Sequence, residues 1–436
     1  MKNYLIFISL FIYLGCSGKS DVSNVPVTTV ATGWKASLVA EIDQSYAGWD
    51  VEIGDPDNDG LNEILVTGCP DSRLYLSKLV NGQWELRLLA ENLAESKPGM
   101  GLTVKVVDIN ADGRNELILG TGQETGGTAF FYLLETDGYK ISRQLISRPV
   151  FNSSSYTHNF AVFDLDRDGL LEVISAYCGG GEIIRYDFDH DLSKIDAEKL
   201  YQLTGSGEES IIADVDNDGQ VEYLASNSFR REAAKVEIFE FDTDGNLITP
   251  ARLLIDGYGD KKCFYASLVV GDVDNDGKNE LVIGWKQDQR INKGTVLGYR
   301  VNDKAERIYT FAYEDEDLDL SYFEKMMVVD DADNDGKNEL IISTRGDNMS
   351  EKISSQHLGY ILEYKINQDK RIKKTLLVDL DSRKAESSWL AVGDADNDGR
   401  NEIVLATGKG DRTKKGTSYI LLVKRKLNAL EVSSLN

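Results

Sequence analysis

The sequence predicts an all-β protein, a seven-bladed β-propeller with four-stranded blades. A nine-residue acidic loop recurs seven times, as in "DADNDGRNE" at residues 394–402. The first residues of successive copies lie 53, 56, 50, 58, 59 and 63 positions apart, a period that suits one four-stranded propeller blade. Short segments rich in Val, Ile and Leu stand before and after the copies and end at Gly or Ser, which is typical of β-strands.

The N-terminal part of the chain supplies the strand that we expect to close the ring. The segment "WKASLVAEI", which begins at Trp34, aligns with "WELRLLAEN", which begins at Trp84 in the fourth-strand position of the first repeat. The last repeat has only three clear strands, so the N-terminal strand would complete the seventh blade. The tail 427–436, which contains "ALEVSSL", is the alternative candidate for that strand.

The first twenty residues, "MKNYLIFISLFIYLGCSGKS", predict export from the cytoplasm. The apolar run from Tyr4 to Leu14 is too short to span a bilayer but suits an export signal. "YLGC" resembles a bacterial lipobox, in which cleavage before Cys16 leaves that residue as the lipidated N-terminus; an ordinary secretory signal is the alternative. We expect a signal peptide at 1–15, a linker at 16–32 and the propeller at 33–436. The protein would then be anchored at the bacterial cell envelope, in the outer membrane, with its side of the membrane left open.

Composition and charge limit the kinds of partner that we expect. The chain has 436 residues, 41% of them hydrophobic and 28% charged, so it can bury a large core. Its formal net charge of −25 argues against a nucleic-acid partner, because a phosphate backbone requires Lys and Arg. Without Cys16 three cysteines remain, an odd number that implies no disulfide framework: Cys69, Cys178 and Cys263.

The recurring loop has the oxygen pattern of a calcium site. Positions 1, 3, 5 and 9 carry a carboxylate or an amide, and position 6 is always Gly. Hard oxygen ligands at alternate positions, bent around a residue that tolerates positive φ, suit Ca²⁺ better than Mg²⁺. An EF-hand is excluded because its last acid stands at position 12 between helices. Acidic residues outnumber basic ones by 73 to 48, and that excess lies almost entirely in the loops.

We therefore predict up to seven bound Ca²⁺ ions, with solvated acidic turns as the alternative. The predicted ligands, blade by blade, are Asp55, Asp57, Asp59 and Glu63; Asp108, Asn110, Asp112 and Glu116; Asp164, Asp166, Asp168 and Glu172; Asp214, Asp216, Asp218 and Glu222; Asp272, Asp274, Asp276 and Glu280; Asp331, Asp333, Asp335 and Glu339; and Asp394, Asp396, Asp398 and Glu402.

These loops make the sequence resemble the FG-GAP or VCBS-type repeats of integrin α-chain propellers and of many bacterial exported proteins. The resemblance covers roughly residues 34–426 and implies seven blades with one calcium in each, between the first two strands. The literal "FG" and "GAP" flanks are mostly missing, which favours the bacterial branch.

The face opposite the calcium loops is where we expect a ligand, because loops on a rigid scaffold carry binding residues. Residues six positions before each loop should surround the mouth of the channel, and some have aromatic neighbours. Mixed aromatic and polar groups of this kind predict a glycan site, with ordinary packing at the channel mouth as the alternative. The candidates are Trp49, His158, Glu208, Tyr265, Lys325 and Trp389.

The sequence predicts a binding module for a glycan or a surface protein, attached to the membrane through Cys16. No Ser-His-Asp order, zinc spacing or nucleotide loop is present, so enzymatic chemistry is not the first hypothesis. The runner-up is a polysaccharide lyase that uses His158 and Tyr156, since some such lyases are propellers with similar calcium loops. A structural subunit of an envelope complex is the third hypothesis, and the oligomeric state stays open.

Overall fold

The computed structural model describes residues 25–42, 46–69, 71–93, 99–123, 131–137, 140–147, 157–229, 232–256, 264–288, 291–302, 307–315, 326–344, 359–381, 385, 387–408 and 416–426. Within this part of the chain, no helix is long and apolar enough to cross a membrane. The expected signal peptide and Cys16 lie outside the described residues.

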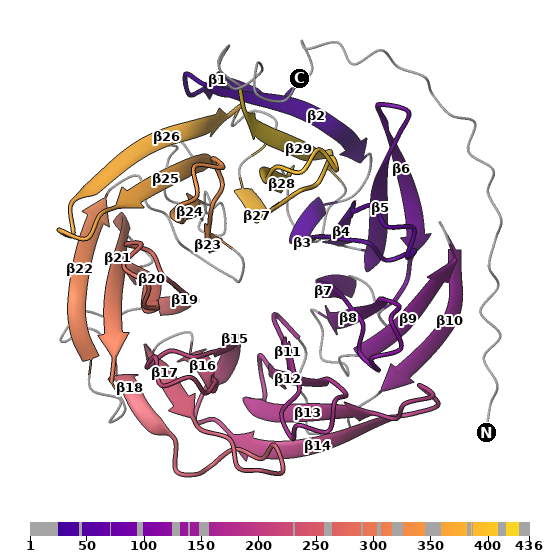
Figure 1. The fold of residues 1–436 in the computed structure, drawn as a ribbon, viewed down its shortest axis with the longest axis vertical. Helices are drawn as coiled ribbons and strands as arrows, with labels where there is room; N and C mark the ends of the chain where they lie inside the picture. Colours follow the sequence, from indigo (N-terminus) through magenta and orange to yellow (C-terminus); the bar gives the residue numbers. More distant parts are fainter. Residues whose placement is uncertain are drawn as a thin grey trace.

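Seven antiparallel sheets stand around a central axis and form a β-propeller, which confirms the predicted fold (Figure 1). We number the blades 1 to 7 in the chain order of their innermost strands. The innermost strands are β3 (Tyr46–Gly54), β7 (Gly99–Val107), β11 (Ala161–Phe163), β15 (Ser206–Ala213), β19 (Phe264–Gly271), β23 (Met327–Asp330) and β27 (Ser387–Gly393). The second strands are β4 (Glu63–Cys69), β8 (Glu116–Gln123), β12 (Glu172–Ala176), β16 (Glu222–Phe229), β20 (Glu280–Asp288), β24 (Glu339–Ser343) and β28 (Glu402–Gly408).

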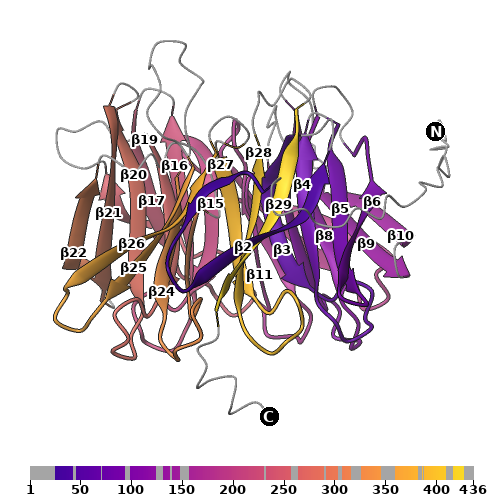
Figure 2. The same ribbon diagram turned by 90° about the horizontal axis from the view of Figure 1, so that it is seen from above.

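The outer half of each blade repeats the same antiparallel order. The third strands are β5 (Arg73–Val80), β9 (Phe131–Asp137), β13 (Glu182–Phe188), β17 (Glu232–Phe239), β21 (Ile291–Val301), β25 (Tyr360–Ile366) and β29 (Ser418–Arg425). The fourth strands are β6 (Gln83–Ala90), β10 (Lys140–Ser147), β14 (Ile195–Gln202), β18 (Arg252–Asp256), β22 (Arg307–Asp315), β26 (Ile372–Leu380) and, for blade 7, β2 (Trp34–Ile42). The connections therefore alternate between the two faces of the ring, which are seen edge-on in Figure 2.

The core lies between neighbouring blades. The second strands β12, β24 and β28 are buried at every position, because a sheet packs against each of their faces. One apolar cluster joins Val404 and Ala406 of blade 7 to Ile64 and Val66 of blade 1. Strands covered on both faces read as continuous apolar runs rather than as alternating ones. This explains why the segments after the acidic loops are so rich in Ile, Leu and Val.

The N-terminal strand closes the ring, as predicted. Strand β2 pairs antiparallel with β29, from Trp34 opposite Arg425 to Ile42 opposite Ser418. The short strand β1 (Val27–Val30) pairs with β26 as a fifth strand of blade 6, so part of the expected linker belongs to a sheet. Figure 1 shows both strands on the outer rim of the ring. The tail 427–436, the alternative closing strand, lies outside the described residues.

Asparagine side chains link successive acidic loops around the ring. At the closing junction, Asn397 Oδ1 accepts the backbone N–H of Asn62 at 2.7 Å, and Asn62 Nδ2 donates to the Asp394 carbonyl at 2.8 Å. The Asn at loop position 4 has a φ of 60–64° wherever it occurs, a conformation that Asn tolerates well. We call this exchange an Asn clasp. It also joins Asn58 to Asn115, Asn217 to Asn279, Asn275 to Asn338 and Asn334 to Asn401.

The two junctions of blade 3 lack the clasp residues. Ala111 and Leu171 stand at these positions between blades 2 and 3, and Arg167 and Val221 between blades 3 and 4. Other polar bonds join these blades: the Leu171 N–H donates to the Ile109 carbonyl at 2.9 Å and Asn110 Nδ2 donates to the His190 carbonyl at 2.9 Å. Between blades 3 and 4, Arg185 Nη1 donates to the Asp244 carbonyl at 3.1 Å.

The clasp at the closing junction should control how easily the ring opens. Asn62→Ala removes the bond to the Asp394 carbonyl, which costs about 1 kcal/mol. We expect faster amide hydrogen exchange in β2, β29 and β3, because only non-covalent contacts hold β27–β29 to β2 and to blade 1. Asn115→Ala removes the matching bond to Asp55 between blades 1 and 2, each of which is built from one continuous stretch of chain, and should leave those strands protected. Equal exchange in the two variants would contradict a special role for the closing junction.

Candidate metal centres and the opposite face

Each acidic loop is folded around its first Asp. In blade 1, Asp55 accepts the backbone N–H groups of Asp59 at 3.1 Å and Gly60 at 2.8 Å. The Gly at position 6 has a φ between 83° and 92° in all seven loops, a backbone conformation that a side chain would strain. These turns bring carboxylates from positions 1, 3 and 9 together, so that one oxygen of each lies within 4.8 Å of the others in blades 1, 3 and 4.

The Glu at position 9 begins the second strand and is at most 4% exposed in every blade. In six loops its Oε2 accepts the backbone N–H of the residue at position 2, at 2.7–3.2 Å. That bond fixes the carboxylate and leaves Oε1 available to a cation. In blade 4 Glu222 Oε1 is buried and accepts no hydrogen bond within the described structure. An orphaned oxygen of this kind fits a bound cation.

Burial and crowding make these carboxylates hard to ionise. Burial, followed by the charges of nearby Asp side chains and Glu240, raises the pKa of Glu222 to about 8. Burial likewise raises the pKa values of Glu116 and Glu172 to about 7. A divalent cation would offset both effects, because it replaces lost hydration and screens like charges. The donor set therefore fits calcium.

Four blades carry a basic side chain on the third strand, opposite the Glu at loop position 9. In blade 1 the Lys78 ammonium nitrogen lies 2.7–2.8 Å from carboxylate oxygens of Asp57, Asp59 and Glu63. The three matching distances in blade 6 are 2.8–2.9 Å. These cations are Lys78 in blade 1, Arg300 in blade 5, Lys365 in blade 6 and Lys424 in blade 7.

The other three blades carry an acid at that position of the third strand: Glu135 in blade 2, Asp187 in blade 3 and Glu240 in blade 4. Their negative charges add to the burial that raises the pKa values of the loop Glu residues. Within the described residues, no Lys or Arg forms an ion pair with the loop carboxylates of these blades. The seven loops thus fall into two electrostatic classes.

The structure brings together only two of the residues expected at the opposite face. His158 precedes β11 and Glu208 lies in β15, and their Nδ1 and Oε2 atoms are 3.2 Å apart. Both are buried, at 5% and 6% exposure. Trp389 is only 1% exposed and packs in the core between blades 7 and 1, so the expectation that it faces a ligand was wrong. Period-two alternation directs Trp389 toward blade 1 and its neighbour Leu390 toward blade 6, so both are buried between blades.

The remaining candidates for this face cannot be placed as side chains. Trp49 and Tyr265 belong to β3 and β19, but only their backbone is described. Tyr156 and Lys325 lie outside the described residues.

Cys178 completes a cluster that sequence reasoning missed. It lies in the connection between β12 and β13, and its Sγ is 3.9 Å from Glu208 Oε1. Ser206 Oγ donates to the same sulfur at 3.1 Å, and burial raises the pKa of the thiol. The only sequence signal was the glycine run in "YCGGGE", which permits a tight turn. We call His158, Cys178 and Glu208 the HCE cluster.

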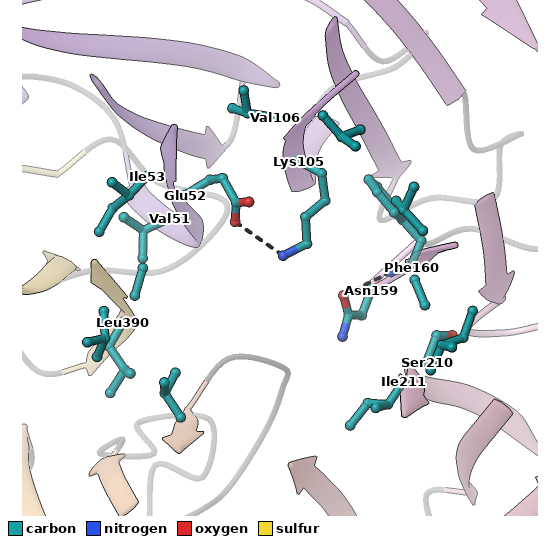
Figure 3. A pocket seen from close by; sticks show the side chains of 17 residues that line it. Val51, Glu52, Ile53, Lys105, Val106, Asn159, Phe160, Ser210, Ile211 and Leu390 are labelled. Carbon is teal, nitrogen blue, oxygen red and sulfur yellow. Dashed lines mark hydrogen bonds and ion pairs between the residues drawn. The ribbon is translucent and has the colours of Figure 1, made fainter. Parts of the chain in front are cut away.

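The innermost strands enclose a cavity of about 590 Å³ along the central channel (Figure 3). Most of its lining is Val, Ile, Leu and Ala. The polar groups are the ion pair between Lys105 Nζ and Glu52 Oε2, at 3.2 Å, together with Asn159 and Ser210. Asn159 Nδ2 donates to Glu209 Oε2 at 3.0 Å and so links blades 3 and 4 below the HCE cluster.

Comparisons with known proteins agree with the repeat. A family model described as FG-GAP-like repeat matches residues 108–175 and 214–283. The chain therefore contains FG-GAP-like repeats within a seven-bladed β-propeller.

Two individual matches are weaker. Among solved structures, the Dos1 propeller is similar over 89% of this chain and 95% of that chain, with 10% identity and a TM-score of 0.47. Phosphoribosyl isomerase A of Mycolicibacterium vanbaalenii is 32% identical over 137 residues, 31% of this chain and 44% of the isomerase. This chain thus spans less than half the length of that curated relative.

The raised pKa values predict how the metal-free protein responds to pH. A carboxyl group whose folded pKa exceeds its ordinary value of 4.5 binds its proton more tightly in the folded state, so protonation stabilises the fold. In chelator, the Tm should therefore rise as the pH falls from about 8.5 to about 6, through the folded pKa values of Glu222, Glu116 and Glu172. Differential scanning fluorimetry would measure this, and a Tm that falls over that range would contradict the ionisation described here.

Proposed function

We propose that this protein is an exported, calcium-stabilised β-propeller that acts as a binding module at the cell envelope. Its ligand, a glycan or a surface protein, would bind the face opposite the acidic loops, and a lipid at Cys16 would hold the module to the membrane. The observation that carries this proposal is that the acidic loops repeat on one face and no loop set repeats on the other. One face carries seven nearly identical acidic loops beside the variable connections between third and fourth strands, whereas neither set of connections on the opposite face repeats.

The acidic face is unsuited to be the ligand site. Its carboxylates turn inward toward their own cation positions. At five junctions the Asn side chains are already hydrogen-bonded in clasps. The opposite face has no such repeat, and its connections differ in length and in residue type. A rigid ring that presents variable loops is the usual arrangement of a binding scaffold.

The central cavity supports a small ligand held within the channel, near the ends of the innermost strands that lead into the acidic loops. A volume of about 590 Å³ lies within the range of small-molecule sites, about 300–1,000 Å³. Its walls are mainly apolar, with a few polar groups in Glu52, Lys105, Asn159 and Ser210. A sugar ring presents apolar C–H faces and hydroxyl groups, which suit such a lining. A protruding loop of a surface protein would suit it equally well.

A polysaccharide lyase is the second candidate function, because Glu208 lies 3.2 Å from His158 Nδ1. A carboxylate at this distance fixes the orientation of an imidazole, which is how general bases are commonly held. The burial of His158 at 5% exposure weighs against direct attack on a polymer.

A binding module of this kind should recognise ligand only while the acidic face is intact. We expect the protein to bind a subset of an immobilised glycan array in calcium buffer, and chelation to remove most of that binding and lower the Tm. Restored calcium should reverse both changes. Release of unsaturated product from uronate polysaccharides, abolished by His158→Ala but not by His190→Ala, would favour the lyase instead. Failure of both assays, with capture of envelope proteins, would favour a structural subunit.

A further inference from the structure

We propose that calcium binds only in blades 2, 3 and 4, and that the other four blades carry a built-in cation in its place. This inference rests on the calcium binding proposed above and specifies where it occurs. The relevant position is the residue on the third strand opposite the Glu at loop position 9. Strand register identifies this position in every blade. The residue after the loop Glu pairs with a residue of the third strand, and the position in question comes directly after that partner in the chain.

In blades 1, 6 and 7 a lysine ammonium group takes the place of an ion. Lys424 Nζ lies 2.7 Å from Asp396 Oδ2 and 3.1 Å from Glu402 Oε1, and it also contacts Asp398. An ammonium group has three donors, which matches three carboxylates. Its distances to oxygen are close to the 2.3–2.6 Å typical of Ca²⁺, so it fills the same space. A second cation would meet both steric overlap and charge repulsion there.

In blade 5 a guanidinium group occupies the position of the ion. Arg300 Nε donates to Glu280 Oε1 at 2.8 Å, and its Nη2 contacts Asp276 and lies 3.6 Å from Asp274 Oδ2. Lys370, from the following blade, adds a second positive charge to Asp274. This loop therefore has cations on two sides without any metal.

Blades 2, 3 and 4 have the opposite electrostatics. A fourth or fifth acidic group stands where the lysine would be, and an arginine holds it from the outer side. Arg143 Nη1 lies 2.8 Å from Glu135 Oε1, and Arg185 Nε lies 2.9 Å from Asp187 Oδ1. Calcium takes six to eight oxygen ligands, so an added carboxylate completes a site that four loop residues leave short. Without an ion, these arginines would offset only part of the repulsion among the carboxylates.

The same arc of the ring lacks the Asn clasps. The junctions between blades 2 and 3 and between blades 3 and 4 are those without paired Asn side chains. The two junctions without clasps thus lie in the arc whose loops lack an internal cation, although other polar bonds, such as that from Asn110 Nδ2 to the His190 carbonyl at 2.9 Å, still join its blades. Calcium would control the rigidity of this arc and leave the rest of the ring unchanged.

Calcium stoichiometry tests the inference directly. Native mass spectrometry and elemental analysis of the protein, dialysed against micromolar calcium, should give three ions per chain. Lys78→Glu should raise the count to four, Glu135→Lys should lower it to two, and the matched Lys78→Arg should leave it at three. A count of seven would overturn this inference and keep the proposed calcium binding; a count of zero would overturn both.

Hydrogen exchange of the unaltered protein tests the same inference without any substitution, so its outcome does not depend on whether a variant folds. Chelation should accelerate exchange at loops 108–116, 164–172 and 214–222, and should leave loops 55–63, 331–339 and 394–402 as they were. Uniform acceleration in all the loops would overturn the division into two classes.

A separate observation supports a second site: we infer that the HCE cluster binds one zinc-class metal ion. Its three side chains come from different segments of blades 3 and 4 and meet on the face opposite the acidic loops. One ligand atom of each lies within 4.8 Å of the other two. The separations, 3.2 Å for His158 Nδ1 to Glu208 Oε2 and 3.9 Å for Cys178 Sγ to Glu208 Oε1, approach the roughly 3.3–3.8 Å between ligands of a tetrahedral zinc ion.

The chemistry of the three groups selects the metal. Imidazole nitrogen, thiolate sulfur and carboxylate oxygen are the donors that zinc accepts, whereas calcium prefers oxygen alone. Two of the ligands are already buried and held in place, and Ser206 orients the sulfur. Three protein ligands leave the fourth tetrahedral position for water or for a donor atom of a bound ligand. The site would thus place a Lewis acid beside the proposed ligand face.

Cobalt(II) serves as a spectroscopic substitute in the test of this site. With the acidic loops saturated by calcium and a non-chelating reductant present, Co²⁺ should bind at one equivalent and give a thiolate-to-cobalt charge-transfer band. Cys178→Ser should abolish the band, while the control His190→Ala, in an exposed turn, should retain it. Absence of the band in the unaltered protein, or its persistence in Cys178→Ser, would overturn the site.

Discussion

Neutralisation of clustered carboxylates is the constraint on which this propeller depends. Each loop draws its acids together because the backbone turns around the first Asp and the last Glu is buried at the start of the second strand. Two like charges 4 Å apart repel by about 1 kcal/mol in water and several times more within a protein. A nearby cation relieves this repulsion, and in four blades the chain supplies one itself, from Lys78, Arg300, Lys365 and Lys424.

This constraint connects the loops to the stability of the ring. Position 4 of every loop has the left-handed conformation, and where it is an Asn its side chain reaches the next loop. The clasp between Asn397 and Asn62 lies beside the non-covalent closure of the ring, which is the pairing of β2 with β29 within blade 7. The loops that gather the acids thus also help to hold the closing junction.

Much of the fold was readable from the sequence, whereas the site was readable only in part. The repeat gave the blades, and the alignment of Trp34 with Trp84 gave the closing strand, because both depend on local patterns. The internal cations were not recognisable in that way: Lys78 follows Glu63 by fifteen residues but Lys365 follows Glu339 by twenty-six, so only strand register reveals that they are equivalent. Cys178 was missed for the same reason, since its partners come from other strands.

The distribution of internal Lys and Arg cations divides the ring into two arcs. On the proposed distribution of calcium, blades 5, 6, 7 and 1 form a continuous arc that contains the closing strand and would keep its shape whatever the calcium concentration. Blades 2 to 4 would depend on calcium, and His158 and Glu208 lie within that arc, on adjacent blades. A change in the angle between blades 3 and 4 would alter the distance between these two residues. Calcium on one face would therefore influence recognition on the other through the packing of the blades, with no contact between the two sites.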